Sequence, residues 1–209
     1  MLSASAVFGS CQADSDVANK LNYLAHHSVF GDIGTYSNAI ERSGAMMTVR
    51  TTVHLKVSAL GVTLHTEDAE RIEQWRGDRL IYFRGITTTN GQVVEVKGDA
   101  RGDSFIITSP SGNVTAPATI IPSNPSSLKL QDSITIMRTD TGKIENVHVS
   151  SEGQPTAVKI NGIDVVAQEY KIDGTIPYKI WIGPRSIPVM FAVDDDSGEV
   201  SFTITNKIN

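Results

Sequence analysis

TVRTTVHLKV, from Thr48 to Val57, is the most regular stretch of the chain, because apolar and polar side chains alternate along it. Its Val and Leu residues share one face with Thr51, and its charged residues and two other Thr residues share the opposite face. Alternation with a period of two residues is typical of a strand that buries one face and exposes the other. The stretch therefore predicts an antiparallel sheet with one dry face.

The same alternation recurs along most of the chain. Further strands are predicted at residues 80–89, 104–108, 134–136, 144–151, 166–172, 178–182, 187–193 and 200–204. Pairs such as Asn90-Gly91 and Asn161-Gly162 separate them, and such pairs adopt the positive φ angles of tight hairpin turns. We therefore expect a long series of hairpins.

Composition agrees with this interpretation, since 59 residues are Val, Ile or Thr and only 24 are Leu or Ala. Side chains branched at Cβ lose rotamer freedom in a helix but pack well on a pleated surface. The expected fold class is all-β: a single antiparallel, strongly curved sheet or half-open barrel built from successive hairpins. We expect residues 21–209 to form one such domain, preceded by a flexible tail or signal remnant at 1–20.

Two segments interrupt the pattern. His65 to Trp75 (HTEDAERIEQW) spaces Ala69, Ile72 and Trp75 by three residues, which favours one or two helical turns. As a strand, the segment would carry charge on both faces, so it would have to project into solvent.

The other interruption, from Ala116 to Gln131, contains three prolines and then Ser126-Ser127. Proline is favoured in the first turn of a helix. The segment predicts a short helix near residues 125–130, inside a loop of the same domain.

The N-terminal segment suggests export. Met1 to Ser10 is small and apolar, as in the later part of a secretory signal, but lacks a basic start. Cys11, the single cysteine, follows Gly9-Ser10 and is a candidate for lipid attachment, as in a lipoprotein. The alternatives are a signal remnant, a lipid-anchored protein and a tail without a role.

Charge and hydropathy exclude several partners. The net charge is −5, and the basic residues are scattered, so nucleic acid and anionic membrane surfaces are poor partners. No apolar run approaches the length of a membrane-spanning helix.

We expect no catalytic residue, metal or cofactor. Phosphate-binding, dinucleotide-binding, nucleophile-elbow and zinc-helix motifs are absent from the sequence. The five histidines lack metal-ligand spacing and are interpreted as solvent-facing. Asp194 to Glu199 places its glycine wrongly for a calcium loop, so it is interpreted as an acidic hairpin turn.

Turn and strand-end motifs over roughly Leu21 to Asn206 resemble a family of uncharacterised bacterial envelope proteins, a domain of unknown function. The residues that carry the resemblance are Gly31 to Thr35, Ser43-Gly44, Ile72 to Leu80, Thr87 to Gly91, Asp140 to Lys143, Val158 to Ile163, Tyr170 and Trp181. That family is similar to the periplasmic lipoprotein-carrier fold, a half-open barrel with a hydrophobic interior. The resemblance implies a periplasmic or exported protein, implies a strand at His65 to Trp75, and supplies no catalytic residues.

Two functions follow as hypotheses. The first is the binding or carriage of a lipid or other apolar ligand in the concave face of the sheet. The candidate lining residues are Val53, Leu55, Val57, Ile134, Ile136, Val189 and Phe191. The second is a structural or protein-interaction module of the cell envelope, in which Glu67 to Glu73 and Asp194 to Glu199 contact an envelope protein.

Overall fold

The computed structural model describes residues 19–128, 130–195 and 197–206, and most of them lie in strands. The strands are β1 (Asn19–His27), β2 (Gly31–Ser43), β3 (Met46–Ala59), β4 (Val62–Arg76), β5 (Arg79–Thr89), β6 (Gln92–Arg101), β7 (Ser104–Ser109), β8 (Gly112–Pro117), β9 (Ile121–Pro122), β10 (Ser133–Met137), β11 (Ile144–Ile160), β12 (Ile163–Asp173), β13 (Tyr178–Ile182), β14 (Pro188–Asp195) and β15 (Gly198–Ile204). Two 3-10 turns, η1 (Pro125–Ser127) and η2 (Pro184–Ser186), are the helical elements of the described residues.

All fifteen strands belong to one sheet, in the order β8-β7-β6-β5-β4-β3-β2-β1-β15-β14-β13-β12-β11-β10-β9. Neighbours are antiparallel except β9 and β10, which pair in parallel. Two series of hairpins meet in the middle of the sheet, where β1 pairs with β15 and Tyr23 lies opposite Ile204. The sheet ends at β8 and β9, which follow each other in the chain, so it stays open along a seam near residues 118–120. The predicted all-β fold with a curved, unclosed antiparallel sheet is confirmed.

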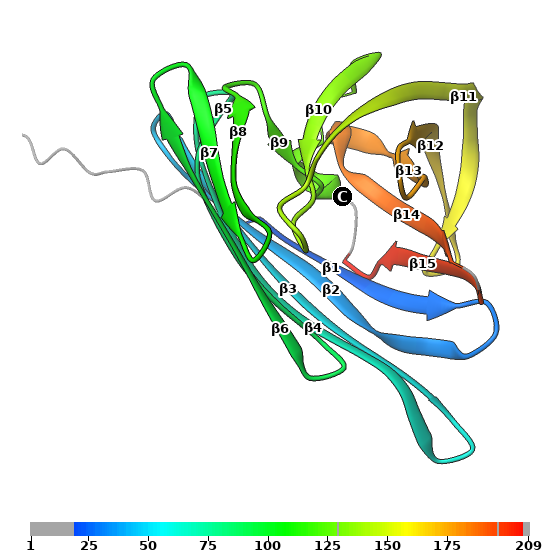
Figure 1. Ribbon diagram of the computed structural model, residues 1–209. Helices are drawn as coiled ribbons and strands as arrows, with labels where there is room; N and C mark the ends of the chain where they lie inside the picture. Colours follow the sequence, from blue (N-terminus) through cyan, green and yellow to red (C-terminus); the bar gives the residue numbers. More distant parts are fainter. Residues whose placement is uncertain (1–18, 129, 196, 207–209) are drawn as a thin grey trace, which may run out of the picture.

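The sheet curves so that its two halves face each other. Figure 1 shows β1 to β8 as a broad twisted wall, with β10 to β14 arching over its inner face. The turn after β10 reaches across to the far part of that wall, since a Cβ on Gly142 would lie 3.2 Å from Ile107 and 3.3 Å from Val96. Side chains from both halves therefore fill the space between them as one core.

The helix predicted near residues 125–130 is wrong. Only Pro125–Ser127 turns, as a single 3-10 turn capped by the side chain of Asn124, and Leu128 is already extended. Leu128 and Leu130 are two residues apart, so they could not share one face of a helix. The prolines and the Asn124 cap therefore produce one turn that does not propagate.

The strand at His65 to Trp75 is confirmed, and the helical periodicity was misleading. This segment lies within β4, which pairs with β3 on one side and β5 on the other. Its charged side chains do not all project into solvent, because Glu73 is fully buried. Tertiary pairing on both sides outweighs the local helical pattern.

The tip of the β3–β4 hairpin extends beyond its neighbours, as Figure 1 shows. Pairing between β2 and β3 ends at Gly34 and Leu55, and pairing between β4 and β5 ends at Glu67 and Thr89. The residues beyond these points form a two-stranded ribbon. At its turn Leu60 has a φ of 52° and is fully exposed.

Candidate ligand cavity

A cavity of about 270 Å³ lies between the two halves of the sheet. Its lining residues come from β2, β3 and β4 on one side. On the other side they come from β10 to β15, from the segment around η1, and from the loops that follow β10 and β12. Its volume exceeds the roughly 150 Å³ of an apolar cavity that holds benzene. It falls just below the roughly 300 Å³ at which ordinary small-molecule sites begin. The space suits one small ligand or one short chain.

One wall of the cavity is apolar. Its aliphatic and aromatic lining residues are Val53, Leu55, Ile136, Val147, Ile172, Ile176, Phe191, Val193 and Phe202. The apolar wall therefore includes Val53, Leu55, Ile136 and Phe191, four of the seven side chains predicted to contact a ligand. That any of them contacts a ligand stays a prediction.

The other three predicted lining residues, Val57, Ile134 and Val189, are buried but do not line this cavity. Val57 lies beyond Leu55 towards the projecting hairpin. Val189 packs under the backbone at Gly183, where an added Cβ would lie 2.5 Å from its Cγ1 atom. The alternation of apolar and polar residues correctly assigned these residues to the inner face of the sheet. It does not predict which part of that face borders the cavity and which part is covered by other side chains.

Aromatic rings make part of this wall rigid. Tyr36 packs edge to face against Phe191 with ring centroids 5.3 Å apart, and Phe191 stacks on Phe202 at 4.5 Å. Tyr23 belongs to the same cluster, with its ring centroid 5.2 Å from that of Phe191. Such ring pairs stabilise a fixed arrangement beyond the contribution of their buried area.

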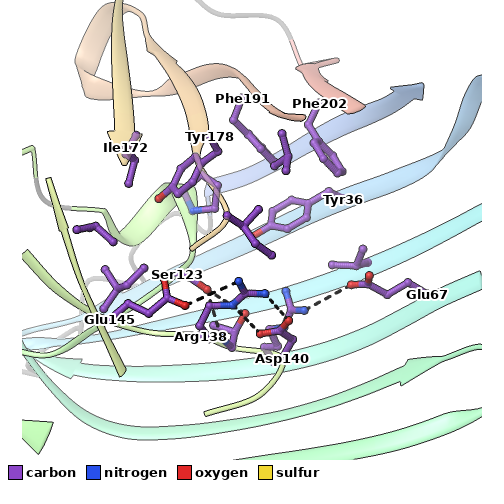
Figure 2. A pocket seen from close by; sticks show the side chains of 18 of the residues that line it. Tyr36, Glu67, Ser123, Arg138, Asp140, Glu145, Ile172, Tyr178, Phe191 and Phe202 are labelled. Carbon is purple, nitrogen blue, oxygen red and sulfur yellow. Dashed lines mark hydrogen bonds and ion pairs between the residues drawn. The ribbon is translucent and has the colours of Figure 1, made fainter. Parts of the chain in front are cut away.

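The opposite end of the cavity is charged. Figure 2 shows Arg138, Asp140 and Glu145 on the side of the cavity away from the rings of Phe191 and Phe202. Arg138 donates to both carboxylate oxygens of Asp140, at 3.1 and 2.6 Å, and lies 4.0 Å from Glu145. Burial alone would raise the pKa of Asp140, but the hydrogen bonds and charge of Arg138 outweigh it, so the pKa is lowered. Arg138 and Asp140 thus form a firm ion pair.

A second arginine at this end is bound more weakly. Arg71 on β4 has its Nη2 atom 3.8 Å from Glu67 Oε1, beyond hydrogen-bond distance. Its Nε atom is buried without a hydrogen-bond partner among the described residues, and so is the hydroxyl oxygen of Tyr178. Both residues line the cavity. An unpaired buried donor is costly, so these two atoms are unusual in a folded protein.

Behind the cavity wall, a buried polar network is centred on Glu73. Its carboxylate accepts hydrogen bonds from Asn124 Nδ2 at 2.7 Å, Ser127 Oγ at 2.6 Å and Trp75 Nε1 at 3.0 Å. Burial raises the pKa of Glu73, while these three donors and the charge of Arg71 act in the opposite direction. The network fastens the segment around η1 to the inner face of β4.

Asn38 and Thr51 extend this network to β2 and β3. Thr51 Oγ1 donates to Asn38 Oδ1 at 2.6 Å, and Asn38 Nδ2 donates to Ser126 Oγ at 2.7 Å. Because Ser123 and Pro125 of the same segment line the cavity, the network also fixes part of its wall.

The acidic surface predicted at Glu67 to Glu73 is divided between the two faces of β4. Glu67 lines the cavity and Glu73 is buried, whereas Asp68 and Glu70 are exposed on the outer face. The segment is therefore not one continuous acidic surface. The turn at Asp194 to Glu199 does join two paired strands, β14 and β15, as expected of a hairpin.

Sequence reasoning missed Arg71, Arg138 and Tyr178 as cavity residues. Arg71 could have been found, because it shares the strand phase of Ala69 and Trp75, which are both buried. Arg138 precedes the Asp140 to Lys143 turn, and its position depends on how that loop crosses the core. No local pattern predicts this crossing.

The structure also bears on the predicted histidines, N-terminal tail, metal sites and membrane spans. His27 is buried, with Nε2 3.0 Å from Ser197 Oγ, so it does not face solvent as predicted; its ring packs on Phe30. Cys11 and the tail before residue 19 lie outside the described residues. Within the described ranges, no group of three or more His, Cys, Asp or Glu residues could hold a metal ion. A search of the same ranges for a helix long and apolar enough to cross a membrane finds none.

Comparison with known proteins gives one family and one solved fold. The family described as a domain of unknown function (DUF6134) matches residues 31–205. The crystal structure of a β-barrel-like protein of domain of unknown function DUF1849 from Brucella abortus is similar to this chain, with a TM-score of 0.66 and 11% identity. The match covers 91% of this chain and 96% of the other, and at this identity it shows the fold alone. No curated protein matches the chain.

Proposed function

The chain belongs to the DUF6134 family, a domain of unknown function, and we propose that it is a non-enzymatic binding or carrier protein for an apolar ligand, exported to the bacterial envelope. The observation that carries this proposal is the cavity between the two halves of the sheet, with its aliphatic and aromatic wall. Ligand sites are typically concave and mostly apolar, with a few polar groups that fix orientation.

The size of the cavity limits the ligand. If a cavity of roughly 150 Å³ holds the six carbons of benzene, about 270 Å³ accommodates roughly ten carbons. Burial of about nine methylenes contributes about 0.8 kcal/mol each, a favourable free energy of ~7 kcal/mol before the costs of association are subtracted. We therefore expect one medium-length chain, bound with a dissociation constant of about 10 µM or weaker.

The side chains around the cavity support binding over catalysis. Among the described residues that line it there is neither His nor Cys, and Ser123 Oγ lies 3.4 Å from Thr139 Oγ1, with no histidine beside it. The carboxylate of Asp140, whose pKa is lowered, is paired with Arg138. A nucleophile next to a general base would be needed for covalent chemistry.

The test is a cavity-filling substitution with a matched control. Leu55→Phe narrows the cavity at a half-buried position, whereas Leu21→Phe enlarges a partly buried side chain that packs on the core and does not line the cavity. Binding of a hydrophobic fluorescent probe should fall at least about fivefold for Leu55→Phe only. Lipid extraction and mass spectrometry of protein purified from a bacterial envelope should find a single-chain apolar molecule. Equal probe binding by both variants, together with no extracted ligand, would refute the proposal.

A further inference from the structure

We infer that the charged end of the cavity binds the anionic head group of a single-chain amphiphile, a carboxylate or a phosphate, with Arg71 as its anchor. The inference rests on the proposed function, because the apolar wall must hold the chain of the same molecule. It adds the chemical class of the ligand and its orientation.

Arg71 has unused hydrogen-bonding capacity in a buried position. Its side chain is only 10% exposed, and its Nε atom has no partner among the described residues. A guanidinium presents five donors and no acceptor, so only an acceptor can satisfy it. Two oxygens of a carboxylate or phosphate match its planar fork in a bidentate arrangement.

Nearby acidic groups do not fill this role. Glu67 reaches only to 3.8 Å and is partly exposed to water. Glu73, two residues along the same face of β4, gives its oxygens to Asn124, Ser127 and Trp75. Tyr36 stays a neutral hydroxyl, because burial raises its pKa to about 12 even though the charge of Arg71 opposes that shift.

Arg138 provides an internal comparison within the same cavity. Its Nε and Nη2 atoms both donate to Asp140, and Glu145 lies on its other side. Arg138 is therefore held by two hydrogen bonds to a carboxylate. Arg71 has instead the 3.8 Å ion pair with Glu67 and the more distant charge of Asp140, whose pKa it helps to lower, so its hydrogen-bonding capacity is left for a ligand.

The polar groups at this end of the cavity disfavour a cationic ligand. Three acidic and two basic side chains line this end, which gives a formal charge of −1, so charge counting alone would favour a cation. However, two residues that line the cavity carry an unpartnered buried polar atom: Arg71 through Nε, a donor, and Tyr178 through its hydroxyl, which can donate. An ammonium group offers no acceptor to either atom. An oxyanion satisfies the donor at Arg71.

The experiment compares four ten-carbon probes on the full chain by isothermal titration calorimetry, below their micelle concentrations. The probes are decanoate, decyl phosphate, decanol and decyltrimethylammonium. We expect one or both anions to bind at least about tenfold more tightly than decanol and the cation, because charge-assisted hydrogen bonds are the strong ones. The two anionic arms distinguish a carboxylate site from a phosphate site.

Variants locate the effect. Arg71→Met should remove the preference for anions over decanol, while Arg71→Lys should retain part of that preference. Arg50→Met is the matched control, since Arg50 is exposed on the outer face of the neighbouring strand. If Arg71→Met does not fold, the four probes are compared on the unmodified chain and on Arg71→Lys. A weaker preference for anions in Arg71→Lys would then support the site.

The outcomes separate the two proposals. Decanol binding as tightly as both anions would overturn the anion site and leave apolar binding intact. Tighter binding of the cation, or an unchanged anion preference in Arg71→Met, would also overturn it. If none of the four probes binds, the proposed function itself fails.

Discussion

Asn124 Nδ2 donates a hydrogen bond to Glu73 Oε1 at 2.7 Å, across 51 residues of sequence. Asn124 also accepts hydrogen bonds through Oδ1 from the Tyr36 hydroxyl and from the backbone N–H of Ser126. One amide thus connects a buried carboxylate, an aromatic ring of the cavity and the η1 turn. In a buried network of this kind, losing one member leaves several others unpaired.

Asn124→Ala should therefore lower the free energy of unfolding by about 3 kcal/mol, because Glu73 and Tyr36 lose a partner in a site closed to water. Urea denaturation measures this loss. Asn113→Ala, at an exposed position of β8, is the control and should stay within about 0.5 kcal/mol of the unmodified protein. A loss below about 1 kcal/mol for Asn124→Ala would show that the network contributes little.

Glu73 should make stability decrease with rising pH. Burial raises its pKa in the folded protein above the ordinary value of 4.5. Its contribution to stability is therefore fully present below pH 4.5 and is lost as pH rises through the folded pKa. Glu73→Gln removes this titration. The amide N–H₂ of the glutamine would face the Trp75 N–H or the Asn124 amide, and the resulting loss of stability should not change with pH. Relative to the unmodified protein, the variant should therefore gain stability as pH rises above 4.5. A difference in urea midpoints that stays constant with pH would contradict this assignment.

Two tyrosines whose hydroxyl groups are buried should respond differently to loss of that group. Tyr23 donates to the carbonyl of Pro188 at 2.9 Å, whereas the Tyr178 hydroxyl is unpartnered within the described residues. Tyr23→Phe should cost about 1 kcal/mol, and Tyr178→Phe should be neutral or slightly stabilising. Thermal unfolding of the two variants side by side tests this, and equal losses would show that Tyr178 has a partner.

Leu60→Asn should stabilise the projecting hairpin. Leu60 and Gly61 have φ angles of 52° and 80°, nearly those of Asn161 and Gly162. Asn tolerates this left-handed conformation, whereas Leu pays about 1 kcal/mol for it. Chemical denaturation should detect a gain of that order in Leu60→Asn, and the reciprocal Asn161→Leu should be destabilising. A loss in Leu60→Asn would show that the exposed leucine is held by contacts.

The fold was largely predictable because its signals are local. The phase of Val49 to Val57 correctly identified buried side chains such as Val49 and Val53. The Asn90-Gly91 and Asn161-Gly162 turns lie where hairpins were expected. The period of two and the turn residues each depend on neighbours in sequence, so one chain suffices to identify them.

The cavity was only partly predictable, because it depends on contacts between distant segments. Phe105 lies against the backbone of Gly98, and the turn at Gly142 crosses the core to reach Ile107. These contacts decide which part of the inner face is filled and which part stays open. Arg71 was missed for a different reason, since charge on both faces of the same segment was expected to project into solvent.

The pairing of β1 with β15 has a consequence for the order of assembly. Among the described strands, β1 precedes all the others in the chain and β15 follows them, so one side of β1 stays unpaired until β15 has been synthesised. Contacts between segments far apart in sequence cost loop-closure entropy and slow folding. An incomplete chain would expose the edges of both β1 and β14 to other proteins. The sheet therefore stays incomplete until β15 has been synthesised and reaches β1.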